Sequence, residues 1–243
     1  MKKVLMSAIL TLVLIISFGC VQKEKIENLD KVIKEIEKNE SFKASVNMRV
    51  SINKTSYETD EMIYSVNEFL SPMNTEGYLT YYQKQDNQKI EVYRKDQFDI
   101  RFINGVKDDN YDGLSSSAFL EQFEFLRIDD SYIKSIKEES TESNTIIRVN
   151  LKFKGRLHKT KFFSSGSFGS NCETVKKNNI KFVLNKKDKL EKVITNYTFV
   201  MDNGLIIKKS TSVSFLERKK QTITYPDGVD FKDPQLKEAL DWV

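Results

Sequence analysis

The feature that most constrains the fold is an unbroken alternation of apolar and polar side chains over residues 42–53. Every even position up to 52 is apolar: Phe42, Ala44, Val46, Met48, Val50 and Ile52. Lys, Ser, Asn or Arg fills each odd position. Because successive side chains of a strand point to opposite faces, this period of two predicts a long strand with one buried face. One-sided burial is typical of antiparallel sheets, since strands of parallel sheets are covered on both faces.

The same period of two recurs along much of the chain. It is found over residues 62–66, 78–82, 90–92, 98–102, 145–153, 180–184, 193–201 and 205–215. Asp202-Asn203-Gly204 lies between the last two segments and predicts a hairpin, because Asn and Gly tolerate the positive φ of tight hairpin turns. The pattern therefore predicts roughly nine to eleven antiparallel strands.

Apolar residues spaced three or four positions apart predict helices. An amphipathic helix is expected over residues 26–39, and further helices within residues 114–126 and 234–242. The chain shows neither an internal repeat nor a long linker, so residues 42–243 are expected to form a single domain. The predicted fold class is α+β, mostly antiparallel β, with a few helices packed on the sheet.

The N-terminus has the pattern of an export signal. Lys2 and Lys3 precede an apolar run from Val4 to Phe18, and a charged segment follows Cys20. A membrane-spanning helix needs about 20 apolar residues, so this shorter run favours a cleaved signal peptide over residues 1–19. A retained anchor helix is the alternative.

The segment Ile16-Ser17-Phe18-Gly19-Cys20 resembles the lipobox of bacterial lipoproteins, in which the cysteine is acylated before the signal is removed. The resemblance implies that Cys20 carries palmitate-type chains and begins a lipidated tether and helix over residues 20–41. Two acyl chains hold a protein stably at a bilayer. We therefore expect a lipid-anchored protein of the cell envelope, exposed on the extracytoplasmic side of the cell membrane.

Composition excludes several kinds of chemistry. The 243 residues include one His and two Cys, which rules out a multi-His metal centre, a Cys-rich zinc module and a disulfide framework. The single imidazole, His158, falls on the expected solvated face of a strand. Cys172 is expected to be an inert thiol in the polar loop 164–172. We therefore expect no cofactor, no catalytic residue and no enzymatic activity.

Charge is distributed unevenly along the chain. Residues 144–243 contain 20 basic and 10 acidic side chains, whereas the preceding part of the exported chain is acidic. The plain interpretation is one sheet whose outer faces differ in sign. The sharper one is that a basic stripe of Lys152, Lys154 and Arg156 faces anionic headgroups at the membrane. Nucleic acid is not an expected partner of an exported domain with this much acid.

Asp108, Asn110 and Asp112, followed by Gly113, match the opening of a calcium loop. Phe119 stands where such a loop places its bidentate Glu. Asp, Asn and Gly are also the commonest turn residues, so an acidic turn without metal is expected and calcium is the weaker alternative.

The lipobox, the amphipathic helix, the long first strand and the strands interrupted by helices together resemble the LolA/LppX-like group of exported bacterial proteins, which includes lipoprotein carriers and surface lipoproteins of Gram-positive bacteria. The resemblance implies a strongly curved, half-open sheet, an incomplete barrel, whose concave face is partly plugged by helices and accommodates acyl chains.

Two functions follow as hypotheses. The first is the binding of a lipid or another amphiphile on the apolar sheet face, with candidate residues Val46, Met48, Val50, Ile147, Val149, Leu151, Tyr197 and Phe199. The alternative is an interaction or sensory module that contacts an envelope protein through residues 108–130 and 164–172.

Overall fold

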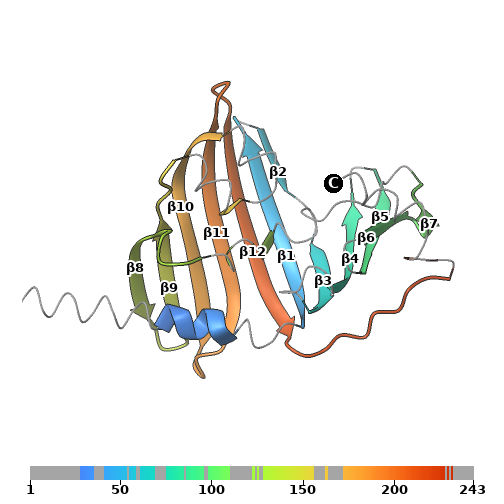
Figure 1. Cartoon of the computed structure of the whole chain (residues 1–243), viewed down its shortest axis with the longest axis horizontal. Coiled ribbons are helices and arrows are strands. Elements are labelled where there is room, and N and C mark those ends of the chain that lie inside the picture. The colour runs from blue at the N-terminus through green and yellow to red at the C-terminus, as the bar shows by residue number, and fades with distance from the viewer. Residues whose placement is uncertain are drawn as a thin grey trace, which may run out of the picture.

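The computed structural model of the chain (Figure 1) describes the following residues: 28–35, 41–53, 55–58, 61–68, 75–84, 86–95, 98–109, 122–123, 125, 128–155, 162–163, 172–227, 229 and 231.

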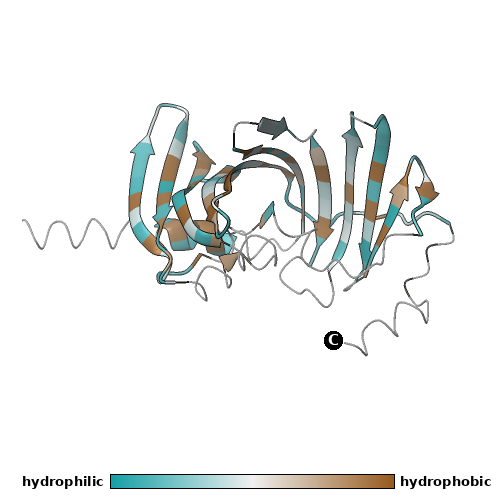
Figure 2. Cartoon of the chain, turned by 90° about the horizontal axis from the view of Figure 1, so that it is seen from above, coloured by the Kyte–Doolittle hydropathy of each residue, from teal (hydrophilic) through white to brown (hydrophobic). Residues whose placement is uncertain are grey.

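Twelve antiparallel strands form one sheet. They are β1 (Phe42–Ile52), β2 (Thr55–Glu58), β3 (Met62–Asn67), β4 (Glu76–Gln83), β5 (Gln88–Lys95), β6 (Phe98–Ile103), β7 (Val106–Lys107), β8 (Ile133–Ser140), β9 (Asn144–Leu151), β10 (Cys172–Asn185), β11 (Leu190–Met201) and β12 (Ile206–Glu217). Their order is β7-β6-β5-β4-β3-β1-β12-β11-β10-β9-β8, and β2 pairs with β1 outside this path. Because β7 and β8 are the two edges, the sheet is open; Figure 2 shows it bent into an arc. The predicted fold class is confirmed.

The alternation in β1 determines which face of the sheet is covered. Phe42, Ala44 and Val46 are buried, and Val46 lies opposite Met62 of β3 and Val213 of β12. We call the face that carries these residues the inner face. Since directly opposite residues point to the same side, this pairing continues the apolar surface across the middle of the sheet.

The main core lies on the inner face and is rich in aromatic side chains. Phe123, Phe125, Phe162 and Phe163 come from outside the strands and pack there with the strand residues. Phe123, for example, contacts Phe42 with ring centroids 5.2 Å apart.

A helix over residues 28–35 lies on the concave side of the arc, near the lower part of β9 and β10 (Figures 1 and 2). Leu29 and Val32 belong to the main core. Asn28 Nδ2 donates to Glu138 Oε2 of β8 at 3.2 Å, and Arg218 Nη1 donates to Glu35 Oε1 at 2.7 Å. The predicted amphipathic helix is therefore confirmed over these residues, while the predicted helices over 114–126 and 234–242 lie almost wholly outside the described residues.

The opposite face is covered at the other end of the sheet. Tyr93, Ile100 and Phe102 form a second core there, packed against residues from the segment that follows β12. These residues are Ile223, Tyr225, Val229 and Phe231. Asn67 of β3 holds the beginning of this segment. Its side chain donates to Gln221 O at 2.9 Å and accepts from Gln221 N at 2.8 Å.

The structure differs from the sequence prediction at five strands. Strands β2, β7 and β8 were not predicted, and β10 begins at Cys172 rather than near Ile180. Strand β9 ends at Leu151, before Phe153. In β8 the register shifts between Ile133 and Ser135, so its apolar residues do not keep a period of two.

Candidate functional site: the inner face and the cavities beside the helix

The structure brings the predicted ligand-binding residues together on the inner face. All eight pack in the main core: Val46, Met48, Val50, Ile147, Val149, Leu151, Tyr197 and Phe199. Met48 and Val50 are half-buried and the other six are buried. Strands β1, β9 and β11 supply them, and β10 and β12 carry the apolar surface between.

Side chains of the chain itself cover the centre of this face. The Phe163 ring lies 5.0 Å from that of Tyr197 and 5.1 Å from that of Phe199, in edge-to-face contacts. Phe162 packs on Phe163 with centroids 4.9 Å apart. Here the inner face is a packed core, and open space is found instead beside the helix.

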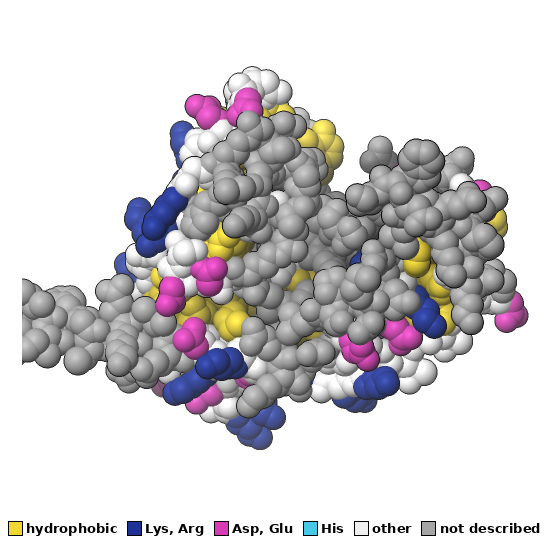
Figure 3. Space-filling view, in the orientation of Figure 1, with side chains coloured by type: hydrophobic (Ala, Val, Ile, Leu, Met, Phe, Trp, Pro, Cys, Tyr) yellow, Lys and Arg dark blue, Asp and Glu magenta, His cyan; other side chains and the backbone are white. Residues whose placement is uncertain are grey.

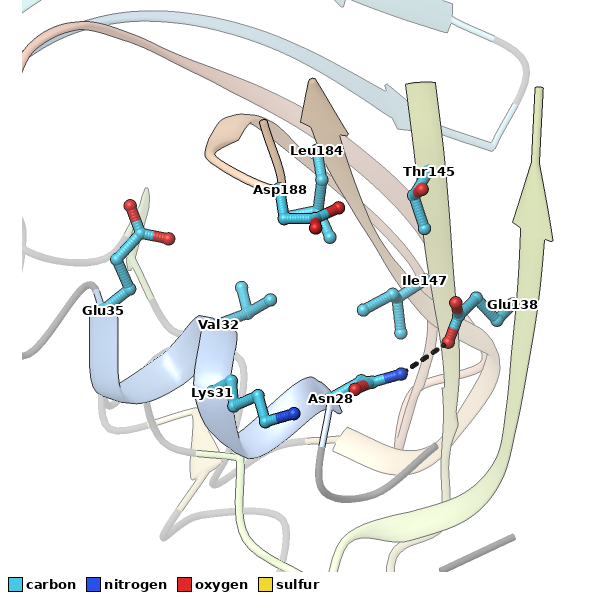
Figure 4. Close-up of a pocket in the computed structure, with 9 residues that line it drawn as sticks. All are labelled: Asn28, Lys31, Val32, Glu35, Glu138, Thr145, Ile147, Leu184 and Asp188. Atoms are coloured by element: carbon cyan, nitrogen blue, oxygen red, sulfur yellow. Dashed lines mark hydrogen bonds between the residues drawn. The ribbon is translucent and has the colours of Figure 1, made fainter. Parts of the chain in front are cut away.

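A cavity of about 260 Å³ lies between the helix and the ends of β8, β9 and β10 (Figure 4). Val32, Ile147 and Leu184 are its apolar lining. Its polar lining consists of Asn28, Lys31, Glu35, Glu138, Thr145 and Asp188. Ile147 is one of the predicted ligand-binding residues, so the cavity reaches the predicted face at this residue.

A second cavity, of about 460 Å³, is lined by other residues of the same helix. Leu29 and Ile33 of the helix and Ile128 and Ile133 near β8 supply its apolar lining. Its polar lining consists of Asp30, Lys34, Asp129, Asp130 and Ser131. Figure 3 shows acidic and basic side chains mixed with apolar ones over the lower left of the face that carries the helix.

The sequence did not indicate the polar residues of the first cavity. Glu138 belongs to the unpredicted strand β8, and Asp188 belongs to the turn between β10 and β11. Asn28 was expected within a helix, but nothing in the helical pattern says which strand the helix packs on. A period-two pattern in β8 is the signal that would have found Glu138, and the register shift in that strand removes it.

A buried ion pair lies on the inner face near the other edge of the sheet. Arg94 Nη1 donates to Asp99 Oδ1 at 3.0 Å, and each side chain is 1% exposed. Among the described residues, Asp99 Oδ2 has no hydrogen-bond partner. Burial raises the pKa of Asp99 from its ordinary 3.8 to about 7, because the charge and hydrogen bond of Arg94 offset only part of the lost hydration.

We expect this carboxyl group to make stability depend on pH. Its pKa is raised on folding, so the folded state binds a proton more tightly; this favourable contribution is complete below about pH 4 and is lost as pH rises through about 7. The free energy of unfolding should fall by about 2 kcal/mol more in the wild type than in Asp99→Asn between about pH 5 and pH 8. Urea titrations at both pH values measure the free energies of unfolding. An equal change of this free energy with pH in the two proteins would contradict the assignment.

Other predicted site residues are placed as follows. Lys152 and Lys154 are exposed beyond the end of β9, and Arg156 lies outside the described residues. Asp108 is half-buried and accepts a hydrogen bond from Arg101 Nε at 2.8 Å, whereas Asn110 and Asp112 also lie outside. Cys20, the predicted acylation site, is likewise outside the described part of the chain.

The sequence placed Cys172 in a polar loop, and the structure contradicts this prediction. It is the first residue of β10 and is 3% exposed. Its Sγ donates to the carbonyl oxygens of Thr174 at 3.2 Å and Val200 at 3.6 Å. The side chain is buried because β10 begins earlier than the apolar pattern indicated, and Cys172 pairs with Met201 of β11.

The described residues contain no group of three or more His, Cys, Asp or Glu side chains placed to hold a metal ion. In the same part of the chain, no helix has the length and apolarity needed to cross a membrane.

No protein-family model and no curated protein sequence matches the chain. Solved structures do. The chain is similar to lipoprotein LppX of Mycobacterium tuberculosis, with 10% identity, a TM-score of 0.46, and coverage of 84% of this chain and 100% of LppX. It is also similar to a DUF1329 family protein of Desulfovibrio piger, with 10% identity, a TM-score of 0.29, and coverage of 88% and 98%. A third similar structure is the ywiB protein of Bacillus subtilis, with 12% identity, a TM-score of 0.21, and coverage of 74% and 99%. The group that the sequence resembles is thus represented among the similar structures.

Proposed function

We propose that the protein is a non-catalytic exported lipoprotein that binds the apolar chain of an amphiphile along the inner face of its sheet. The observation that carries this proposal is the cavity beneath the helix, because Val32, Ile147 and Leu184 line it and also belong to the main core. An apolar lining with a few polar groups is the usual form of a small-ligand site. In the proposed complex, the end of the apolar chain occupies this cavity and the rest lies along the strands.

In the proposed complex, the aromatic pair Phe162 and Phe163 moves away from the inner face and the ligand takes its place. The contacts described above between this pair and the sheet are ring contacts with Tyr197 and Phe199. Such contacts are the sum of many weak attractions that an acyl chain can replace. Binding therefore exchanges one set of apolar contacts for another.

The proposal places the protein at the membrane through acylation of Cys20. The described helix begins at residue 28, eight residues after Cys20, and eight extended residues span at most about 29 Å. A lipid anchor on Cys20 would thus hold the cavity close to the surface from which an amphiphile is taken. An envelope protein partner is the alternative, and it predicts no bound amphiphile in the following experiment.

Native mass spectrometry tests the proposal on the full chain carrying Cys20→Ser, incubated with a dansyl-labelled fatty acid. We expect a stable one-to-one complex, and about tenfold weaker binding by fluorescence titration for Thr145→Trp, whose indole would fill the cavity that Thr145 lines. Ile146→Trp is the matched control, because Ile146 is the next residue of β9 and points to the opposite face. A mass that stays unliganded, or equal affinities of the two variants, would count against the proposal.

A further inference from the structure

A small polar group interrupts the apolar inner face. Thr195 and Tyr197 of β11 and Lys209 and Thr211 of β12 are all buried. Thr195 lies directly opposite Thr211, and Tyr197 lies directly opposite Lys209. Because opposite residues in an antiparallel pair point to the same side, the four side chains share one patch of the inner face. We call them the polar patch.

Lys209 is the unusual member of this patch. The residue is 5% exposed and lies between Val50 of β1 and Tyr197 of β11. No hydrogen bond or ion pair joins its ammonium group to any of the described residues. A lysine is almost never buried unless it is paired, because removing an ammonium group from water without a compensating anion is strongly unfavourable.

Thr211 adds a second polar group to the same patch. It is 1% exposed, and within the described part of the chain its Oγ1 has no hydrogen-bond partner. Thr211 is two residues from Lys209 on the same strand, so both side chains point to the inner face. A cation and a hydroxyl donor that share one patch suit a ligand with negatively charged oxygens.

The alternation of β12 places Lys209 on the inner face and its neighbour Lys208 on the other face. Ile207, Thr211 and Val213 are the other buried residues of this strand. Lys208 is exposed on the other face of the sheet, where it pairs with Thr198 of β11. The two consecutive lysines thus differ in the face that they occupy.

We propose that Lys209, together with Thr211, binds the anionic headgroup of the amphiphile, a carboxylate or phosphate. This inference rests on the proposed function, because it assigns one end of the same ligand. Ile147 at the cavity lies across from Phe182, which lies across from Val193 and Val213 in turn. Lys209 is four residues from Val213, or about 13 Å along the strand. The headgroup and the cavity therefore lie at separate places on the inner face, as a linear amphiphile requires.

Calorimetric titration of the full chain carrying Cys20→Ser with dodecanoate, dodecanol and acetate tests the headgroup assignment. We expect the protein to bind dodecanoate about tenfold more tightly than dodecanol, and Lys209→Met to bring dodecanoate to the affinity of dodecanol. Lys208→Met should leave both affinities unchanged, and Lys209→Arg should keep the preference for the anion. Since Lys209→Met replaces a largely buried lysine side chain with an apolar one of similar length, we expect its thermal midpoint to be at least that of the wild type.

The outcomes separate the two proposals. Equal binding of dodecanoate and dodecanol, or an unchanged preference in Lys209→Met, would overturn the headgroup assignment and leave amphiphile binding intact. Acetate binding as tight as that of dodecanoate would also overturn it, because the patch would then be a site for small anions. If neither dodecyl compound binds, both proposals fail.

Discussion

At about pH 8, replacement of Arg94 by methionine is expected to lower the free energy of unfolding by about 3 to 5 kcal/mol. Asp99 would stay buried without the guanidinium that now donates to it at 3.0 Å. A buried charge that has lost its ion-pair partner costs far more than the pair contributes when intact. Lowering the pH to about 5 should reduce the loss, because protonation of Asp99 removes the uncompensated charge.

The double variant Arg94→Met/Asp99→Leu separates this cause from lost packing, since it removes both charges and should recover most of the stability. Arg49→Met is the control for an exposed pair: Arg49 and Glu58 are both more than half exposed, so its cost should be below about 1 kcal/mol. Urea unfolding of the three variants provides the comparison. Equal costs for Arg94→Met and Arg49→Met would show that burial of the inner pair has no energetic consequence.

Phe163→Ala is expected to destabilise the protein by a similar amount, about 3 to 5 kcal/mol, because it leaves a cavity in the most aromatic part of the core. The lost ring contacts Tyr197, Phe199, Phe153 and Phe162, with centroids between 4.9 and 5.3 Å away. Phe98→Ala, at a half-buried position of β6, should cost about 1 kcal/mol.

The same variant also bears on ligand binding. A cavity lined by aromatic side chains stays dry and accepts apolar molecules. Dodecanoate should therefore raise the thermal midpoint of Phe163→Ala by more than that of the wild type. Should the two midpoints rise equally, Phe163 would be a core residue that does not compete with the ligand.

Strand β1 shows which part of the fold could be predicted from the sequence. Its regular alternation follows from one buried face and a straight register from Ala44 to Ile52 against β12. Strand β10 shows the limit: its register shifts between Lys176 and Asn179, where Lys177 has a φ of 49°. An added residue in the strand changes the face of every side chain that follows, so no single period of two fits the whole strand.

The candidate site could be predicted only as an apolar face. The pattern placed Ile147, Tyr197 and Phe199 on the apolar face of the sheet, because the period of two within each strand determines which face a side chain occupies. It could not place the helix over Ile147, since packing between distant elements depends on the shape of both surfaces. Lys209 was missed for another reason: the period of two over residues 205–215 puts it on the same face as Ile207 and Val213, but a lysine is rarely buried and was not expected there.

The pairing of β1 with β12 affects the order in which the sheet can be assembled. Ser45 lies opposite Ser214, so the central pair joins residues 214 − 45 = 169 positions apart. Hairpins on either side, such as β4–β5 and β10–β11, need only neighbouring residues. Such hairpins can form before distant segments meet, but β1 must wait for residues 206–217 before its second edge is paired. Contacts of such long range make folding slow, so the second edge of the central strand stays open to other chains until residues 206–217 pair with it.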